Sequence, residues 1–340
     1  MLIERRLTAQ LLAGPPAHDP VAVVNRLLAV QGQDARGVRL AIRARSTGLT
    51  AADVNRALTE DRSLVITWLN RGTLHLVSSE DYSWLHSLTT PRIITHNARR
   101  LAQEGVTPSL AERGLKVIER CLAEEGPLTR AQLGERLASA DVPTERQALP
   151  HLLMLSGLHG LTVRGPMIGR EHAYVLVRDW LGEPEPVDRD RALAALARRY
   201  LAGYGPAGEC DLAKWAGLRL RDARTGLIGI ATALDVRADG LVDLVGHPPE
   251  TKLPPPRLLG AYDPLLLGWA SREPFLGSNQ NLVTSNGLFR PFALVRGRGA
   301  ATWSLRAGEV SIETFRRISR RDGSALKRDA EDVIRFLGAS

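Results

Sequence analysis

The chain has 340 residues, 44% of them hydrophobic, which is enough for two or three domains with buried cores. It has no apolar stretch near the ~20 residues that a membrane span requires, and its two cysteines lie alone, with no zinc-ligand spacing around them. These features exclude the membrane-spanning and disulfide-rich classes and favour a folded cytoplasmic protein without a metal or other cofactor.

The charge balance is basic. Lys and Arg number 45 against 37 Asp and Glu, a formal net charge of +8, and only four of the 45 are lysines. The planar guanidinium of arginine bonds phosphates and base edges in two places. A basic chain without basic tails is typical of a folded nucleic-acid binder, although many basic proteins bind no nucleic acid.

The first predicted helices lie at the N-terminus. Residues 1–16 read as a helix rather than a secretory signal, because a long apolar region and a cleavage site are missing. A second helix is expected over 20–31, and it runs into the stretch "QGQDARG". Gln31 and Gln33 either satisfy carbonyls at the helix end or aim two amides at one atom. Because positions i and i+2 do not share a helix face, convergence needs Gly32 at or just past the helix end, or an extended turn.

Three stretches repeat at one offset. The segments "GLTAADVNRAL" (48–58), "PLTRAQLGERL" (127–137) and "PAGECDLAKWA" (206–216) are each 79 residues apart. Each is followed by β-rich runs around a turn, which predict hairpins within 64–78, 161–177 and 234–245. Short helices followed by a hairpin predict a winged helix-turn-helix unit in each copy. In the second copy, Thr129 is the expected helix cap.

The residue pattern of the sequence changes after about residue 250. A proline-rich connection, "HPPETKLPPP", leads into short β runs separated by glycine turns, and a basic helix closes the chain over 324–338. This pattern predicts a small β-barrel or sheet capped by a helix.

Four stretches carry a resemblance to a known family. They are "VVNRLLAVQGQDARGVRLAIRAR", "TWLNRGTLHLVSSEDYSWL", "LLGAYDPLLLGW" and "FRPFALVRGRGAATW". In this order they resemble the AlkZ-like (AlkZ/YcaQ) family of winged-helix DNA glycosylases, over nearly the whole chain. The resemblance implies a C-shaped α+β fold of three tandem winged helix-turn-helix units and a C-terminal β-barrel. The corresponding ranges are 1–106, 107–186, 187–250 and 251–340.

The resemblance also implies an activity. The chain would be a monofunctional DNA glycosylase that acts, as a monomer in the nucleoid, on duplex DNA containing alkylated purines such as N7-alkylguanine, including interstrand crosslinks. The family's catalytic Gln-x-Gln motif falls on Gln31 and Gln33. General repair and self-resistance to a DNA-alkylating natural product both stay open. The alternatives are a non-catalytic winged-helix DNA-binding protein or transcriptional regulator, and a protein-binding scaffold.

Neutral glutamines suit this chemistry. An amide is no general base at neutral pH, but it offers an oxygen acceptor and an NH2 donor. An N7-alkylguanine already carries a positive charge and leaves as a neutral base. The enzyme then needs only to hold a water at C1′ and to provide an environment that tolerates a sugar with oxocarbenium character. The two amide oxygens could hold that water at C1′. Asp34 either stabilises the oxocarbenium or forms a local ion pair with Arg36.

Basic residues near predicted turns and helix starts are candidate DNA contacts, with solvated turns and a half-buried strand histidine as the alternatives. Arg164 and Arg170 are expected to flank the turn of the second hairpin. The tryptophans Trp180, Trp215, Trp269 and Trp303 are expected in cores, and Tyr262, Asp263 and Pro264 are interpreted as structural. The DNA-binding candidates are Arg36, Arg71, His75, Arg164, Arg170, Arg219, Arg221, Arg224, Arg296 and Arg298.

Overall fold

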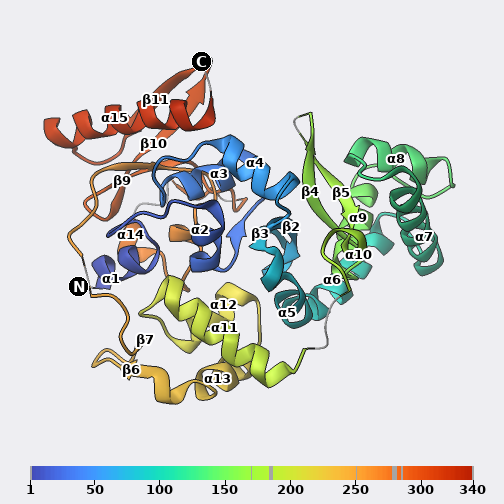
Figure 1. The fold of residues 1–340 in the computed structure, drawn as a ribbon, viewed down its shortest axis with the longest axis horizontal. Coiled ribbons are helices and arrows are strands. Elements are labelled where there is room, and N and C mark those ends of the chain that lie inside the picture. The colour runs from blue at the N-terminus through green and yellow to red at the C-terminus, as the bar shows by residue number, and fades with distance from the viewer. Residues whose placement is uncertain are drawn as a thin grey trace. The chain divides into compact units, whose positions relative to one another are not determined.

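The computed structural model describes residues 2–169, 171–183, 187–249, 251–277, 282–284 and 286–338. The chain divides into two compact units (Figure 1): unit 1 comprises Met1–Val54 with Asp190–Ser340, and unit 2 comprises Asn55–Arg189. Helices and sheets are mixed, as the α+β prediction requires. Among the described residues, no helix is both long and apolar enough to cross a membrane.

Unit 1 combines both ends of the chain. Its helices are α1 (Leu2–Ala9), α2 (Pro20–Leu27), α3 (Ala35–Arg43), α4 (Ala51–Thr59, which ends in unit 2), α11 (Arg189–Tyr204), α12 (Glu209–Ala216), α13 (Leu220–Ile228), α14 (Glu273–Leu276) and α15 (Arg320–Leu337). Its strands are β1 (Val30–Gln31), β6 (Leu234–Val236), β7 (Val242–Leu244), β8 (Arg257–Leu259), β9 (Phe292–Val295), β10 (Arg298–Arg306) and β11 (Glu309–Thr314). Two 3₁₀ turns complete it, η2 (Ala231–Ala233) and η3 (Pro264–Leu266).

Unit 2 is a helical layer around a twisted antiparallel sheet. Its helices are α5 (Ser79–Thr89), α6 (Pro91–Gln103), α7 (Pro108–Glu125), α8 (Arg130–Ala138), α9 (Ala148–Leu158) and α10 (Val177–Trp180). Its strands are β2 (Leu64–Leu69), β3 (Thr73–Ser78), β4 (Thr162–Ile168) and β5 (Glu171–Leu176), which lie in the order β3-β2-β4-β5. The 3₁₀ turn η1 (Asn70–Gly72) joins β2 to β3, so the hairpin predicted within 64–78 is confirmed.

In the structure, the sequence repeat of 79 residues corresponds to three equivalent helix starts. Helices α4, α8 and α12 begin at Ala51, Arg130 and Glu209. Before each helix, the cap residue's backbone N–H donates to the side chain three positions on: Thr50 to Asp53 (2.8 Å), Thr129 to Gln132 (2.9 Å) and Gly208 to Asp211 (3.0 Å). At α8 the cap is reciprocal, because the Gln132 amide also donates to Oγ1 of Thr129 at 3.3 Å, which confirms Thr129 as a cap.

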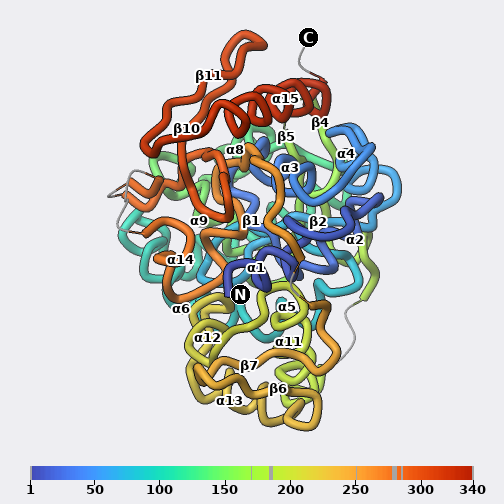
Figure 2. Tube along the Cα trace, turned by 90° about the vertical axis from the view of Figure 1, so that its left-hand side faces the viewer, coloured from blue at the N-terminus to red at the C-terminus, as the bar shows by residue number. Residues whose placement is uncertain are grey.

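The C-terminal sheet is open, so the predicted β-barrel is wrong and the alternative prediction, a sheet capped by a helix, is confirmed. In the described residues its antiparallel strands run in the order β11-β10-β9-β8, and no barrel closes. Helix α15 lies along this sheet (Figures 1 and 2), burying Leu326 and Val333 against Trp303 and Leu258. Leu40 of α3 joins the same core. A sheet whose apolar side is covered by helices gains nothing further by closing.

Aromatic residues form a second core in unit 1. Trp215 and Trp269 each pack on Tyr204, with ring centroids 5.4 Å and 5.7 Å apart. These two tryptophans and Trp303 are buried, as predicted. Trp180 of unit 2 is only half-buried, with the Arg62 guanidinium 4.1 Å from its ring centroid, because an indole at the end of a short helix is left partly open to water.

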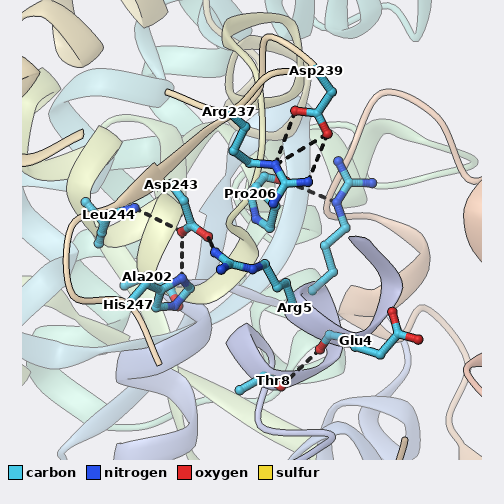
Figure 3. Close-up of polar contacts among 11 residues, drawn as sticks. Glu4, Arg5, Thr8, Ala202, Pro206, Arg237, Asp239, Asp243, Leu244 and His247 are labelled. Carbon is cyan, nitrogen blue, oxygen red and sulfur yellow. Dashed lines mark hydrogen bonds and ion pairs between the residues drawn. The ribbon is translucent and has the colours of Figure 1, made fainter. Parts of the chain in front are cut away.

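A polar network ties α1 to the β6–β7 hairpin within unit 1 (Figure 3). The Asp243 carboxylate accepts from Arg5 (3.2 Å) and lies 2.6 Å from Nδ1 of His247, whose Nε2 faces the Ala202 carbonyl oxygen at 3.1 Å. Arg6 donates to the Pro206 carbonyl oxygen. Burial alone would raise the pKa of Asp243, but the bonds from His247, the Leu244 amide and Arg5 outweigh burial and lower it.

We expect Asp243→Asn to destabilise the protein at pH 7 by about 3 kcal/mol, the lower end of the cost of breaking a buried ion pair. A carboxylate whose folded pKa is depressed stabilises the fold above its unfolded pKa of about 3.9, and this contribution is lost as the pH falls further. Urea unfolding at pH 7, 5 and 3.5 checks this: the gap between wild type and variant should shrink at pH 3.5. An equal gap at all three values would contradict it.

Candidate active site

Gln31 and Gln33 lie on a non-helical link between two helices, not at a helix end. Helix α2 stops at Leu27, and Leu28 turns the chain with φ 63°. Gln31 ends β1, and α3 begins only after its cap residue, Asp34. The helix predicted over 20–31, and Gly32 at or just past its end, are therefore wrong. Gln31 is in β1 and Gln33 is in the bend that precedes the α3 cap, which agrees with the alternative of a turn.

The two amides converge. Nε2 of Gln31 donates to Oε1 of Gln33 over 2.5 Å. Gln31 is 7% exposed, whereas Gln33 is open to solvent. The buried amide therefore orients the exposed one, and Gln33 presents the pair's polar atoms to whatever binds there.

A close backbone contact places the start of α3. The Asp34 carboxylate accepts from the Gly37 amide and caps the helix. A Cβ on Gly37 would lie 2.4 Å from the carbonyl oxygen of Ala261, and one on Gly260 would lie 3.0 Å from the Cα of Gly37. Only glycine permits this approach, which brings the turn around Tyr262 beside Asp34.

Buried arginines anchor the other end of α3. Arg45 and Asp263 are both 0% exposed and form a two-bonded pair of 2.8 Å and 2.9 Å, and Arg45 also donates to Oε1 of Gln10. Arg43 pairs with Asp329 and Asp332 of α15. Sequence reasoning missed Arg43 and Arg45. Their signal is a pair of arginines beside the apolar residues Leu40 and Ile42 at the end of a helix, which predicts buried partners because a buried charge must be paired.

Tyr262 has an unusual backbone for an aromatic residue. Its φ is 56°, in the left-handed region that bulky residues rarely adopt. Its ring packs on Phe289, with centroids 5.6 Å apart, and the Arg272 guanidinium lies 4.8 Å from the Phe289 centroid. Burial first, and then the Asp34 charge, raise the pKa of the Tyr262 hydroxyl, so the phenol stays neutral at physiological pH.

These elements place the glutamine pair on a rigid frame that offers polar atoms without a charged base. Within the described part of the chain, no group of His, Cys, Asp and Glu could hold a metal ion.

Residues 24–336 match the model of the family described as "DNA glycosylase AlkZ-like". This chain belongs to the AlkZ-like DNA glycosylase family. The resemblance inferred from the four stretches is therefore confirmed, and with it the enzyme class, which acts on N-glycosidic bonds.

Similar proteins support the assignment over the full length. A Streptomyces sahachiroi protein named interstrand DNA cross-link repair glycosylase is 27% identical over 349 aligned residues, covering 96% of this chain and 92% of that protein. The solved structure of Streptomyces sahachiroi DNA glycosylase AlkZ superposes with a TM-score of 0.81 at 24% identity, covering 100% of this chain and 96% of the other. The two molecules share one fold.

In unit 1 of this AlkZ-like chain, the predicted DNA-contacting arginines are exposed. Arg36 donates to the Leu305 carbonyl oxygen at 3.5 Å, near the end of β10. The other exposed members are Arg219, Arg221 and Arg224 at the start of α13, and Arg296 and Arg298 at the start of β10. Arg224 is paired with Glu209 (2.7 Å) and Arg296 with Asp322 (3.3 Å).

In unit 2 the predicted residues differ in accessibility. Arg71 is exposed at the tip of the β2–β3 hairpin. His75 is 2% exposed, and burial first, then the Arg71 charge, lower its pKa to about 3, which argues against a phosphate contact. Arg164 lies within β4 with its guanidinium 4.7 Å from the Tyr174 ring centroid, so its predicted place beside the turn is wrong. Arg170 lies outside the described residues.

Proposed function

We propose that this AlkZ-like chain hydrolyses the N-glycosidic bond of alkylated purines in duplex DNA, N7-alkylguanine above all, and that Gln31 and Gln33 position the attacking water. The observation that carries the proposal is the hydrogen bond between the two amides on the link from α2 to α3, with Gln33 exposed. The relative's printed name supports extending the substrate to interstrand crosslinks.

The proposed reaction needs no protonated leaving group. The C1′–N9 bond breaks with its electron pair going to N9, which neutralises the cationic base, and a water oxygen bonds to C1′ and loses its proton to solvent. Oε1 of Gln33 already accepts from Gln31, and its second lone pair can accept from that water. Amide dipoles directed at the sugar favour its developing positive charge.

Release of base tests the proposal. The protein is incubated with a duplex containing one N7-methylguanine, and free base is quantified by chromatography against the spontaneous rate. We expect released base and an abasic strand, with none from the unmodified duplex. Binding without release would instead make this chain a non-catalytic DNA-binding member of the family.

We further propose that three tandem winged helix-turn-helix units, over 1–106, 107–186 and 187–250, precede the C-terminal sheet domain, 251–340. The equivalent caps of α4, α8 and α12 support this organisation. So do the antiparallel hairpins β2–β3, β4–β5 and β6–β7, one after each of those helices.

The exposed arginines of unit 1 support a DNA backbone contact. A cavity of about 450 Å³ is lined by Arg296, Arg298, Arg316 and Arg317, with Asp322 the acidic residue of its lining. Arg298 and Arg36 lie near opposite ends of β10, which at ~3.3 Å per residue puts them about 20 Å apart. That separation spans more than half a turn of duplex DNA.

We expect DNA binding to weaken steeply with salt, log K falling by about 0.9 for each phosphate neutralised. Replacing Arg219, Arg221 or Arg298 by alanine should each lower that slope by about 0.9 and weaken lesion-bearing and plain duplexes equally, because phosphates carry no base information. Fluorescence anisotropy between 50 and 300 mM salt measures it. Lys116→Ala is the matched control, since Lys116 lies outside the proposed contact and is as exposed as Arg221; both are paired, Lys116 with Glu112 at 2.8 Å and Arg221 with Asp222 at 3.8 Å. A flat salt response would contradict a duplex partner.

A further inference from the structure

Near Asp34, the residue that follows Gln33, lies a half-buried aromatic ring that the water-positioning role does not use. Tyr262 adopts a left-handed backbone, φ 56°, which costs an aromatic residue about 1–3 kcal/mol and persists only because the surroundings impose it. The surroundings here are the Gly37–Ala261 contact on one side and the buried Arg45–Asp263 pair on the other. A strained, partly exposed ring next to a reactive site points to a role in binding.

Two neighbours define what this ring can bind. Phe289, which is 8% exposed, packs against the Tyr262 ring. The Arg272 guanidinium lies over the Phe289 ring and donates to the Leu266 carbonyl oxygen. The charge that acts on Tyr262 is the Asp34 carboxylate. Asp34 is held in place by capping α3 and directly follows Gln33.

We propose that Tyr262 and Asp34 form the specificity-determining corner of the site, where the ring of Tyr262 stacks on the base and the Asp34 carboxylate favours a base that carries positive charge. This inference rests on the proposed excision of cationic purines. An aromatic face attracts a cation by about 0.5–2 kcal/mol, more as water is excluded, and a nearby carboxylate adds a Coulomb attraction that an unmodified, neutral guanine does not experience. Normal DNA is thereby discriminated against before any bond breaks.

The test compares binding to two duplexes that differ in one base. One carries 2′-fluoro-N7-methyl-2′-deoxyguanosine, whose fluorine suppresses hydrolysis while the base stays cationic; the other carries guanine. The measured quantity is the ratio of the two dissociation constants. Tyr262→Leu and Asp34→Asn should each lower the preference for the cationic duplex about three- to tenfold. Tyr262→Phe keeps the ring and should keep most of the preference.

Asp34→Asn separates charge from capping, because asparagine caps helices as well as aspartate does. Asp19→Asn is its matched control: Asp19 caps α2, accepting from Val21 and Ala22, and its replacement removes the same charge at another helix start. The control should leave the ratio unchanged. Thermal melting of each variant verifies that the fold is intact.

The outcomes separate the two proposals. If the wild type releases N7-methylguanine but Tyr262→Leu and Asp34→Asn keep its preference, the corner is overturned and the proposed function stands. If the wild type neither prefers the cationic duplex nor releases base, both fail. If Asp19→Asn lost as much preference for the cationic duplex as Asp34→Asn, the loss would be explained by the change in the protein's net charge, and the role of Asp34 would be overturned.

Discussion

Replacing Gln31 and Gln33 together by alanine should lower the single-turnover rate of N7-methylguanine release by about 10²- to 10³-fold, the usual cost of losing a preorganised polar group at a reacting centre. Because Nε2 of Gln31 holds Oε1 of Gln33, each single variant should lose nearly as much as the double variant. Groups that act as a unit are not additive. Quenched-flow or timed chromatography of the released base measures all three rates.

Binding and folding should survive that change. Gln33 is exposed and Gln31 is buried, so the melting temperature should fall by no more than a few degrees, while the affinity for the fluorinated duplex should stay close to that of wild type. A double variant that releases base at the wild-type rate would remove the glutamines from the mechanism. A double variant that no longer binds the duplex would make them binding residues instead.

Asp263→Asn should destabilise the protein by about 3–5 kcal/mol, the cost of leaving a buried charge without its partner. Arg45 and Asp263 are both fully buried, and asparagine preserves the shape and one oxygen acceptor, so the loss reports the charge. The free energy of unfolding in urea, extrapolated to water, is the measurement. The rate of base excision should fall together with stability at temperatures near the midpoint of thermal unfolding, because the pair anchors the end of α3 and the turn that carries Tyr262.

A surface pair provides the comparison. Asp322 pairs with Arg296, whose side chain is 74% exposed, and Asp322→Asn should cost about 1 kcal/mol or less. If Asp263→Asn and Asp322→Asn were equally mild, the buried pair would not be what fixes α3.

Much of the architecture was predictable because its signals are local. The three helix starts at 79-residue spacing follow from small residues and caps within four positions of each other, and a cap depends on nothing distant. The hairpin at Asn70–Gly72 is likewise set by its own turn residues. The predicted barrel failed because closure depends on which strands meet, and α15 with α3 covers the sheet instead.

The candidate site shows the same division at the scale of single residues. The sequence by itself determined that two glutamines two positions apart stand in an arginine-rich, repeated chain of the AlkZ-like family. Only the tertiary structure decided their conformation: α2 stops at Leu27, Leu28 turns the chain with φ 63°, and β1 follows, so that Leu28 and Val30 are both 0% exposed in the core. The contacts that hold the site join residues more than 200 positions apart, as in Arg45 with Asp263. Such pairings are chosen by the packing of the whole unit, since no short-range propensity distinguishes one distant partner from another.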